Sequence, residues 1–241
     1  YRRQRQMCIR DSIELIKKGN PEYALRQKGK VAELALGYQG STGALINMGA
    51  LDMGIPEEDL PDIVSRWREA NKRIRDLWYS MDNAAVQVIT QGGSVGINGL
   101  LLAREYDYNQ GTDCFTIQLP SGRKLYYVSP GIGENQWGNP SISYMGMDQK
   151  TKRWKRIETY GGKLVENIVQ AYARDCLAVA MVRLAEEGWK ICFHVHDEVI
   201  VEAPTGTSWE QVAEVMGRPI DWAPGLLLRG DGYSTPSYRK D

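Results

Sequence analysis

The stretch Phe193–Ala203 reads FHVHDEVIVEA, with three polar residues between two runs of β-prone side chains. This pattern predicts two short strands joined by a tight turn that holds His196, Asp197 and Glu198. Neighbouring carboxylates repel each other. A divalent cation such as Mg²⁺, which prefers oxygen ligands, would remove that cost. The competing interpretation is an ordinary turn, because Asp is common in turns.

A second stretch, Arg26–Gly40, reads RQKGKVAELALGYQG. Arg26, Lys30, Leu34 and Tyr38 recur at every fourth position, so a helix would stack them on one face. That face is cationic at one end and aromatic at the other, which matches the layout of a nucleoside triphosphate. Arg and Lys bind phosphates, and Tyr stacks on a base. A solvated basic face with a half-buried Tyr is the competing interpretation.

A third set of polar residues lies on a long helix predicted over residues 161–187. Lys163, Asn167, Gln170 and Arg174 share one face of this helix. Amides and cations can contact phosphates and the minor-groove acceptors that all base pairs present. A polar face that simply meets water would have the same spacing.

The rest of the chain predicts an α/β (α+β) fold. An amphipathic helix is expected over 63–89, with Trp67, Ile74 and Trp78 on its apolar side and several Arg residues opposite. We expect glycines 40, 43 and 49 to loosen the segment that follows a helix over 21–37. Residues 137–156 are expected to be irregular or to form a hairpin. The other expected elements are helices over 21–37 and 209–216, strands within 92–133, a hairpin over 191–202, and a strand from Leu226 before an irregular end.

Composition excludes some classes of protein. The chain has 241 residues, of which 42% are hydrophobic, yet no apolar run reaches the roughly 20 residues of a membrane helix. The net charge is zero, which does not exclude nucleic acid, because binding needs only a local basic face. The four cysteines are scattered, which indicates reduced thiols in a cytosolic protein rather than a zinc site or disulfides: Cys8, Cys114, Cys176 and Cys192.

The N-terminal segment has a separate origin in our interpretation. Residues 2–12 read RRQRQMCIRDS and resemble one translated reading frame of a common sequencing adapter. We therefore leave residues 1–12 out of the fold reasoning. A natural basic arm is the competing interpretation.

The segment that begins at Arg26 resembles motif B of the family A DNA polymerases, phage type. The resemblance implies that Arg26 and Lys30 hold the triphosphate of the incoming nucleotide, and that Lys30 is the acid for the leaving pyrophosphate. It also implies that Tyr38 stacks at the nascent base pair. Leu34 stands where the family usually has an aromatic residue, although phage-type members carry Leu there, and Gln39 stands where Gly is commoner.

The segment Phe193–Ala203 resembles motif C of the same family, the palm hairpin. By that resemblance Asp197 binds metal, Glu198 is an accessory carboxylate, and His196 lies near the primer terminus. The intact enzyme would use two Mg²⁺ ions. The string ENIVQAYARD resembles the helix before that hairpin, with Gln170 and Asp175 in register. This favours contact with DNA by the face that Gln170 shares with Lys163, Asn167 and Arg174.

The resemblance implies a right-hand polymerase fold, with fingers over 13–90 and palm over 91–241. The thumb and the motif A aspartate would lie upstream, so this chain is expected to be an inactive fragment of an enzyme of DNA replication. Its expected partners are primer–template DNA and dNTP, with any processivity factor unknown, in the cytoplasm of a phage-infected bacterium.

Two other functions fit parts of the sequence. A metal-dependent nuclease could use Asp197, Glu198 and His196, but the segment from Arg26 would then be accidental. A non-enzymatic nucleic-acid-binding module could instead use the Arg-rich helix expected over 63–89.

Overall fold

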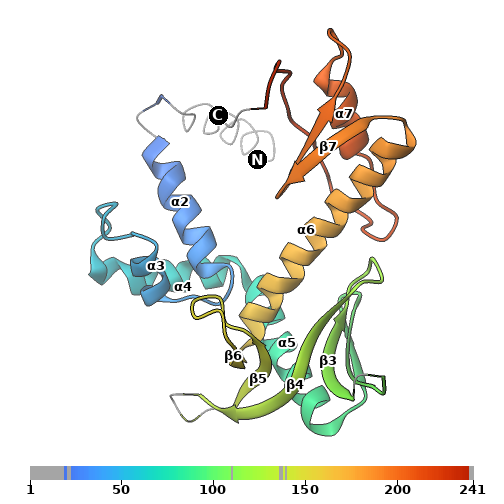
Figure 1. Cartoon of the computed structure of the whole chain (residues 1–241). Coiled ribbons are helices and arrows are strands. Elements are labelled where there is room, and N and C mark those ends of the chain that lie inside the picture. Colours follow the sequence, from blue (N-terminus) through green and yellow to red (C-terminus); the bar gives the residue numbers. More distant parts are fainter. Residues whose placement is uncertain (1–18, 21–22, 110, 136–137, 139, 239–241) are drawn as a thin grey trace. The chain divides into compact units, whose positions relative to one another are not determined.

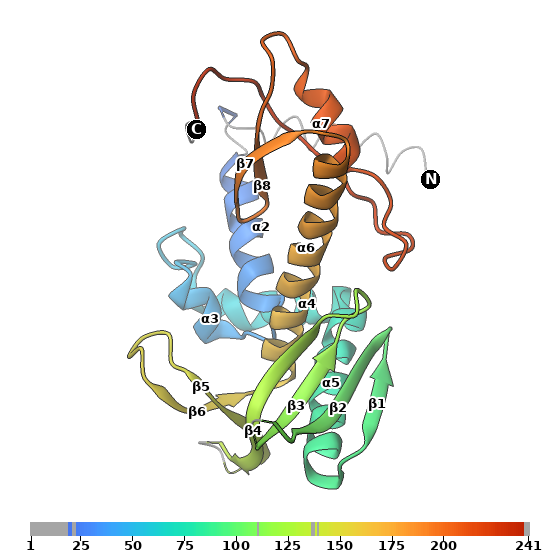
Figure 2. The same cartoon turned by 45° about the vertical axis from the view of Figure 1, so that its right-hand side comes forward.

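A computed structural model gives the structure of the chain (Figures 1 and 2). It describes residues 19–20, 23–109, 111–135, 138 and 140–238. The adapter-like segment therefore lies outside the described residues. The fold is a mixture of helices and antiparallel strands, as the sequence predicts. Within the described residues, no helix combines the length and the apolar character needed to span a membrane.

The chain divides into two compact units that alternate along the sequence. The first contains residues 1–87, 131–143 and 156–166, and the second contains residues 88–130, 144–155 and 167–241. We describe each unit by itself. The assignment of residues 13–90 to fingers and 91–241 to palm stays a prediction.

The first unit is built mainly from helices that pack around a few large apolar side chains. Leu36, Leu45, Leu60 and Trp78 are almost completely buried. The predicted helix over 21–37 is confirmed within the described residues, but the Gly-containing segment that follows forms another helix instead of a loose connection. The helices are α2 (Tyr23–Leu36), α3 (Thr42–Asn47), α4 (Leu60–Ala70) and the first part of α5 (Lys72–Gln91), with a short 3₁₀ turn at Glu57–Asp59.

The prediction of one helix over 63–89 is wrong, because α4 and α5 are separated at Asn71. The side-chain amide of Asn71 donates a hydrogen bond to the carbonyl of Trp67 (2.9 Å), while its own carbonyl accepts from the first turn of α5. Asn competes with helical hydrogen bonding in this way and favours helix ends. The break leaves Ile74, which the single helix would bury, 38% exposed.

A six-stranded antiparallel sheet contains all the strands between α5 and α6 (Gly161–Glu186). The register places Leu102 opposite Ile117 and Phe115 opposite Tyr127, and these four side chains are buried. Of the two structures expected for residues 137–156, the hairpin is the one found. The strands follow one another in chain order: β1 (Ser94–Ile97), β2 (Leu100–Asp107), β3 (Thr112–Gln118), β4 (Lys124–Glu134), β5 (Pro140–Met147) and β6 (Trp154–Thr159).

The second unit ends with a hairpin, β7 (Lys190–Val195) and β8 (Glu198–Glu202), and helix α7 (Trp209–Met216). Figures 1 and 2 show α7 beside the C-terminal end of α6. There Arg183 of α6 donates hydrogen bonds to the carbonyls of Arg218 and Pro219, at 3.1 and 2.7 Å. The hairpin and both helices have the limits expected from the sequence to within one or two residues. The three cysteines among the described residues, Cys114, Cys176 and Cys192, are free thiols, as predicted.

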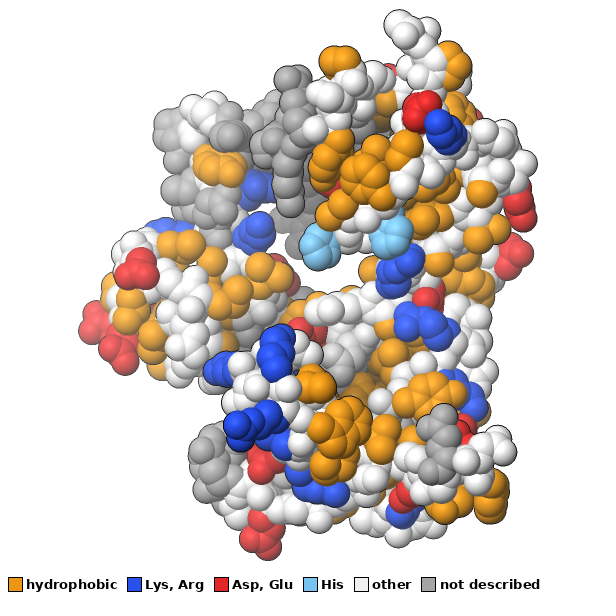
Figure 3. All heavy atoms as spheres, in the orientation of Figure 1, with side chains coloured by type: hydrophobic (Ala, Val, Ile, Leu, Met, Phe, Trp, Pro, Cys, Tyr) orange, Lys and Arg blue, Asp and Glu red, His pale blue; other side chains and the backbone are white. Residues whose placement is uncertain are grey.

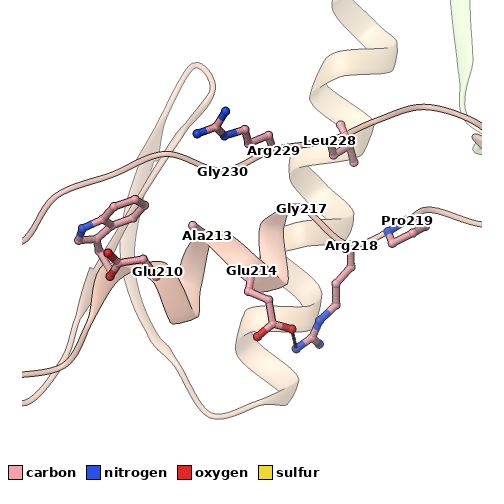
Figure 4. A pocket seen from close by; sticks show the side chains of 10 residues that line it. Glu210, Ala213, Glu214, Gly217, Arg218, Pro219, Leu228, Arg229 and Gly230 are labelled. Carbon is pink, nitrogen blue, oxygen red and sulfur yellow. Dashed lines mark hydrogen bonds and ion pairs between the residues drawn. The ribbon is translucent and has the colours of Figure 1, made fainter.

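The strand predicted from Leu226 is wrong, because residues 226–238 have no regular secondary structure. This segment instead packs on α7 through its glycines. A Cβ on Gly230 would lie 2.7 Å from the Cα of Ala213, so the two backbones approach more closely than a side chain allows. Figure 4 shows the segment crossing α7, with Leu228, Arg229 and Gly230 lining an open pocket together with the helix.

Candidate functional site

The cationic face of α2 is open to solvent. Arg26 and Lys30 are exposed, and Leu34 is 48% exposed, although it is apolar. Tyr38 does not lie on the helix as predicted, because α2 ends at Leu36 and Tyr38 occupies the following turn, half-buried. Helical spacing therefore aligns Arg26, Lys30 and Leu34 on α2, whereas the position of the Tyr38 ring is set by the turn after the helix.

Two tryptophans support the C-terminal half of α2. The rings of Trp67 and Trp78 stack with centroids 5.8 Å apart and planes within 3° of parallel. The indole N–H of Trp67 donates to the carboxylate of Glu33 (3.1 Å), and that of Trp78 donates to the carbonyl of Gly37 (3.1 Å). Each ring thus buries apolar area and also bonds α2 through its polar edge. The first contact lies in the last turn of α2 and the second lies at Gly37, directly before Tyr38.

The same turn is joined to the N-terminus of α6. Gln39 has a φ of +69°, a left-handed conformation in which Gly is favoured. Its side-chain oxygen accepts a hydrogen bond from the backbone N–H of Gly162 (2.9 Å), and Asp82 accepts from that of Gly161 (2.8 Å). The first amides of a helix have no partner within it. These two side chains therefore cap α6 and fix the turn that carries Tyr38.

The connection between β7 and β8 is a two-residue hairpin turn, and we call residues 196–198 the acidic turn. Val195 pairs with Glu198, which leaves only His196 and Asp197 in the loop. His196 has a φ of +50°, a left-handed conformation that is uncommon outside Gly, although Asn, Asp and His adopt it more often than other residues do. The three polar residues of the turn are exposed, so their side chains are available to a ligand.

Asp197 and Glu198 carry carboxylate oxygens, the ligand type that Mg²⁺ prefers. Among the described residues there is no group of three or more His, Cys, Asp or Glu side chains that could hold a metal ion. The metal-binding role of Asp197 and Glu198 therefore stays a prediction.

The polar face predicted on α6 is partly used inside the protein. The side-chain amide of Asn167 donates to the hydroxyl of Tyr127 (3.0 Å), and Lys163 forms an ion pair with Glu166 (2.6 Å). Burial raises the pKa of Tyr127 to about 12, although the hydrogen bond from Asn167 opposes the shift. Of the four predicted DNA contacts, Lys163, Gln170 and Arg174 are exposed on α6, and Asn167 is half-buried.

The turn at Ser121–Arg123 is bonded to α6 near Gln170 and Arg174, a contact that the sequence analysis did not predict. Arg123 forms an ion pair with the buried Asp175 (2.7 Å) and donates to the carbonyl of Ala171 (2.8 Å). The hydroxyl of Ser121 donates to the other oxygen of the same carboxylate (2.5 Å). Buried Asp is rare unless it is paired, so an Asp in the middle of a long helix was the available signal.

The face of α2 belongs to the first unit and the acidic turn to the second. The prediction that these two groups meet around one substrate therefore stays a prediction.

Comparison with known proteins gives one clear relative. The chain is 47% identical over 232 residues, 95% of its length, to the DNA polymerase of Bacillus phage SP02. The chain is similar to a phage DNA polymerase. It spans about a third (34%) of that polymerase. No protein-family model matches the chain, and no solved structure matches it.

Proposed function

We propose that this chain provides the nucleotide-binding helix and part of the metal-binding site of a family A DNA polymerase. The parent protein transfers a nucleotidyl group from dNTP to a primer 3′-hydroxyl, directed by a template, in the infected host's cytoplasm. The observation that carries this proposal is the 47% identity to a phage DNA polymerase across 95% of the chain. The exposed cations of α2 and the exposed acidic turn support it.

The roles on α2 follow from its charge and shape. Arg26 binds triphosphate oxygens as a planar fork, and Lys30 binds them as a point charge. Lys30 also donates a proton to the leaving pyrophosphate, whose negative charge grows in the transition state. Tyr38 packs against the new base pair, held by the contacts of Gln39 and Trp78 on its turn. Leu34 presents an apolar surface to the sugar.

The roles on the hairpin follow from its ligand atoms. Asp197 and Glu198 hold Mg²⁺ together with carboxylates that we place upstream of this chain. When bound, the metal neutralises charge on the phosphate oxygens. His196 lies beside the primer terminus. We expect the chain alone to be inactive, because two neighbouring carboxylates supply only part of the oxygen ligands that two Mg²⁺ ions need.

The exposed residues Gln170 and Arg174 of α6 contact the duplex, with Lys163 and Asn167 on the same face. Amides and cations there reach minor-groove acceptors and phosphates without selecting a sequence. This sequence-blind contact suits an enzyme that copies any template.

Primer extension tests the proposal. We expect no extension by the 241-residue chain, and extension after it is joined to its natural upstream part. In the joined protein, Lys30→Ala should lower the rate of the chemical step by on the order of a hundredfold or more. Lys28→Ala, which removes an equal charge two residues earlier on the same helix, should change it little. Degradation of DNA in Mg²⁺ without synthesis would instead indicate the nuclease.

A further inference from the structure

A second basic surface lies outside the candidate site, at the turn between β5 and β6. The segment Asp148–Arg156 reads DQKTKRWKR and contains five basic residues and one acid. Lys150, Lys152 and Arg153 are exposed. Figure 3 shows Lys and Arg side chains gathered over this hairpin. We call residues 148–154 the basic turn.

The single acid of the basic turn is occupied by the turn itself. One carboxylate oxygen of Asp148 accepts hydrogen bonds from the amides of Lys150 (3.1 Å) and Thr151 (2.7 Å) and from the Thr151 hydroxyl (2.9 Å). The other pairs with Lys155 (2.8 Å). Lys155 and the Thr151 donors hold the pKa of Asp148 well below its usual range. Asp148 therefore shapes the turn and leaves the charges of Lys150, Lys152 and Arg153 facing solvent.

Lys152 occupies a backbone position that does not suit a lysine. Its φ is +55°, a conformation that Gly or Asn adopts at lower cost. Its side chain makes only a long contact with Gln149 (3.4 Å) among the described residues, while its backbone N–H donates to the carbonyl of Asp148 (2.8 Å). The backbone of Lys152 therefore closes the turn, whereas its exposed ammonium group adds little to folding and is available for binding.

An exposed aromatic ring follows the cations directly. Trp154 is 57% exposed at the first position of β6. Cations that track a phosphate chain and an aromatic surface on which bases stack are the two features of single-stranded nucleic acid sites. The bases of a duplex are already stacked on each other, and an acidic polypeptide has no base to stack on the ring.

We propose that the basic turn binds single-stranded nucleic acid, with Lys150, Lys152 and Arg153 on the phosphates and Trp154 stacked on a base. The proposal does not depend on the roles given to α2 or to the β7–β8 hairpin. An experiment can therefore refute nucleic-acid binding by the basic turn without refuting the roles of α2 and the hairpin, and the reverse also holds.

Fluorescence anisotropy of a labelled oligothymidine with the full 241-residue chain tests the proposal. Replacing Lys150, Lys152 and Arg153 by Ala should weaken binding at low salt by on the order of tenfold or more, and should reduce the salt slope by about 2. The matched control replaces Arg66, Lys72 and Arg73 by Ala, removing the same charge from α4 and α5. If the control variant lost as much affinity as the basic-turn variant, the assignment to the basic turn would be overturned. It would also be overturned if neither variant lost affinity.

Two single variants separate binding from folding. Lys152→Gly relieves the positive φ, so it should raise the midpoint of thermal unfolding while weakening oligothymidine binding; unchanged binding would overturn the role of Lys152. Trp154→Ala should weaken binding roughly fivefold or more. If duplex DNA or polyglutamate bound the wild-type basic turn as tightly as oligothymidine, the turn would be a general anion surface and the proposal would be wrong.

Discussion

The close approach of α6 to the Tyr38 turn gives the sharpest test of the structure. In the substitution Gly162→Ala, the new Cβ would lie 2.4 Å from the Cβ of Gln39 and 2.6 Å from the carbonyl oxygen of Tyr38. Neither atom is the end of a flexible side chain, so the turn and the helix must move apart. That movement also strains the hydrogen bond between the Gly162 amide and Gln39.

The magnitude follows from three effects on the free energy of unfolding. Forcing an extra methyl group into a packed contact costs about 1–3 kcal/mol, and losing the hydrogen bond costs about 1 kcal/mol. The higher helix propensity of Ala returns up to about 1 kcal/mol. We therefore expect a net loss of about 2 kcal/mol, which lowers the unfolding midpoint of a chain of this size by about 4–8 °C.

Urea and thermal unfolding, followed by far-ultraviolet circular dichroism, would measure this loss. The matched control is Gly29→Ala on α2, where a Cβ would meet nothing within 4 Å. The control should be stabilised by about 0.5–1 kcal/mol, because Gly is a poor helix former. If Gly162→Ala were as stable as Gly29→Ala, the described junction between the Tyr38 turn and α6 would be wrong.

Three further predictions follow from the site. The folded-state pKa of Tyr127 is raised to about 12 from an ordinary 10, so its contribution to the free energy of unfolding is full below pH 10 and is lost as pH rises from 10 to 12. Tyr127→Phe should remove about 3 kcal/mol of this alkaline destabilisation, measured as urea midpoints against pH. Arg123→Met should destabilise the chain by about 3 kcal/mol, because Asp175 would remain buried without its partner, whereas Asp175→Asn in the same variant should recover part of the loss. In the joined polymerase, Leu34→Tyr should change the selection between deoxy and dideoxy nucleotides, and an unchanged ratio of incorporation rates would contradict the proposed contact with the sugar.

The elements that the sequence predicted well are those in which a single periodicity persists. The helical spacing of the polar residues over 161–187 and the strand–turn–strand pattern of 191–202 each match what is observed. The hairpin is predictable because its polar turn is flanked on both sides by apolar runs. Both patterns are local, so they survive without knowledge of the tertiary structure.

The errors arose where one side chain or one distant contact decides the outcome. The apolar stripe continues across Asn71, so periodicity alone could not reveal that its amide would end α4. The segment from Leu226 has strand-forming residues, but glycines packed against α7 determine its path. The ion pair between Arg123 and Asp175 joins residues 52 positions apart, which no local pattern encodes.

The six-stranded sheet has a consequence for the order in which the protein is assembled. Its strands lie in the sheet in the order in which the ribosome makes them, so each new strand meets the edge left by the one before it. Pairing of this kind closes only short loops and is fast. The sheet can therefore grow during translation, and each temporarily open edge is covered within the time needed to synthesise one more strand. The order of its strands therefore shortens the time for which an edge of this sheet is open to another nascent chain.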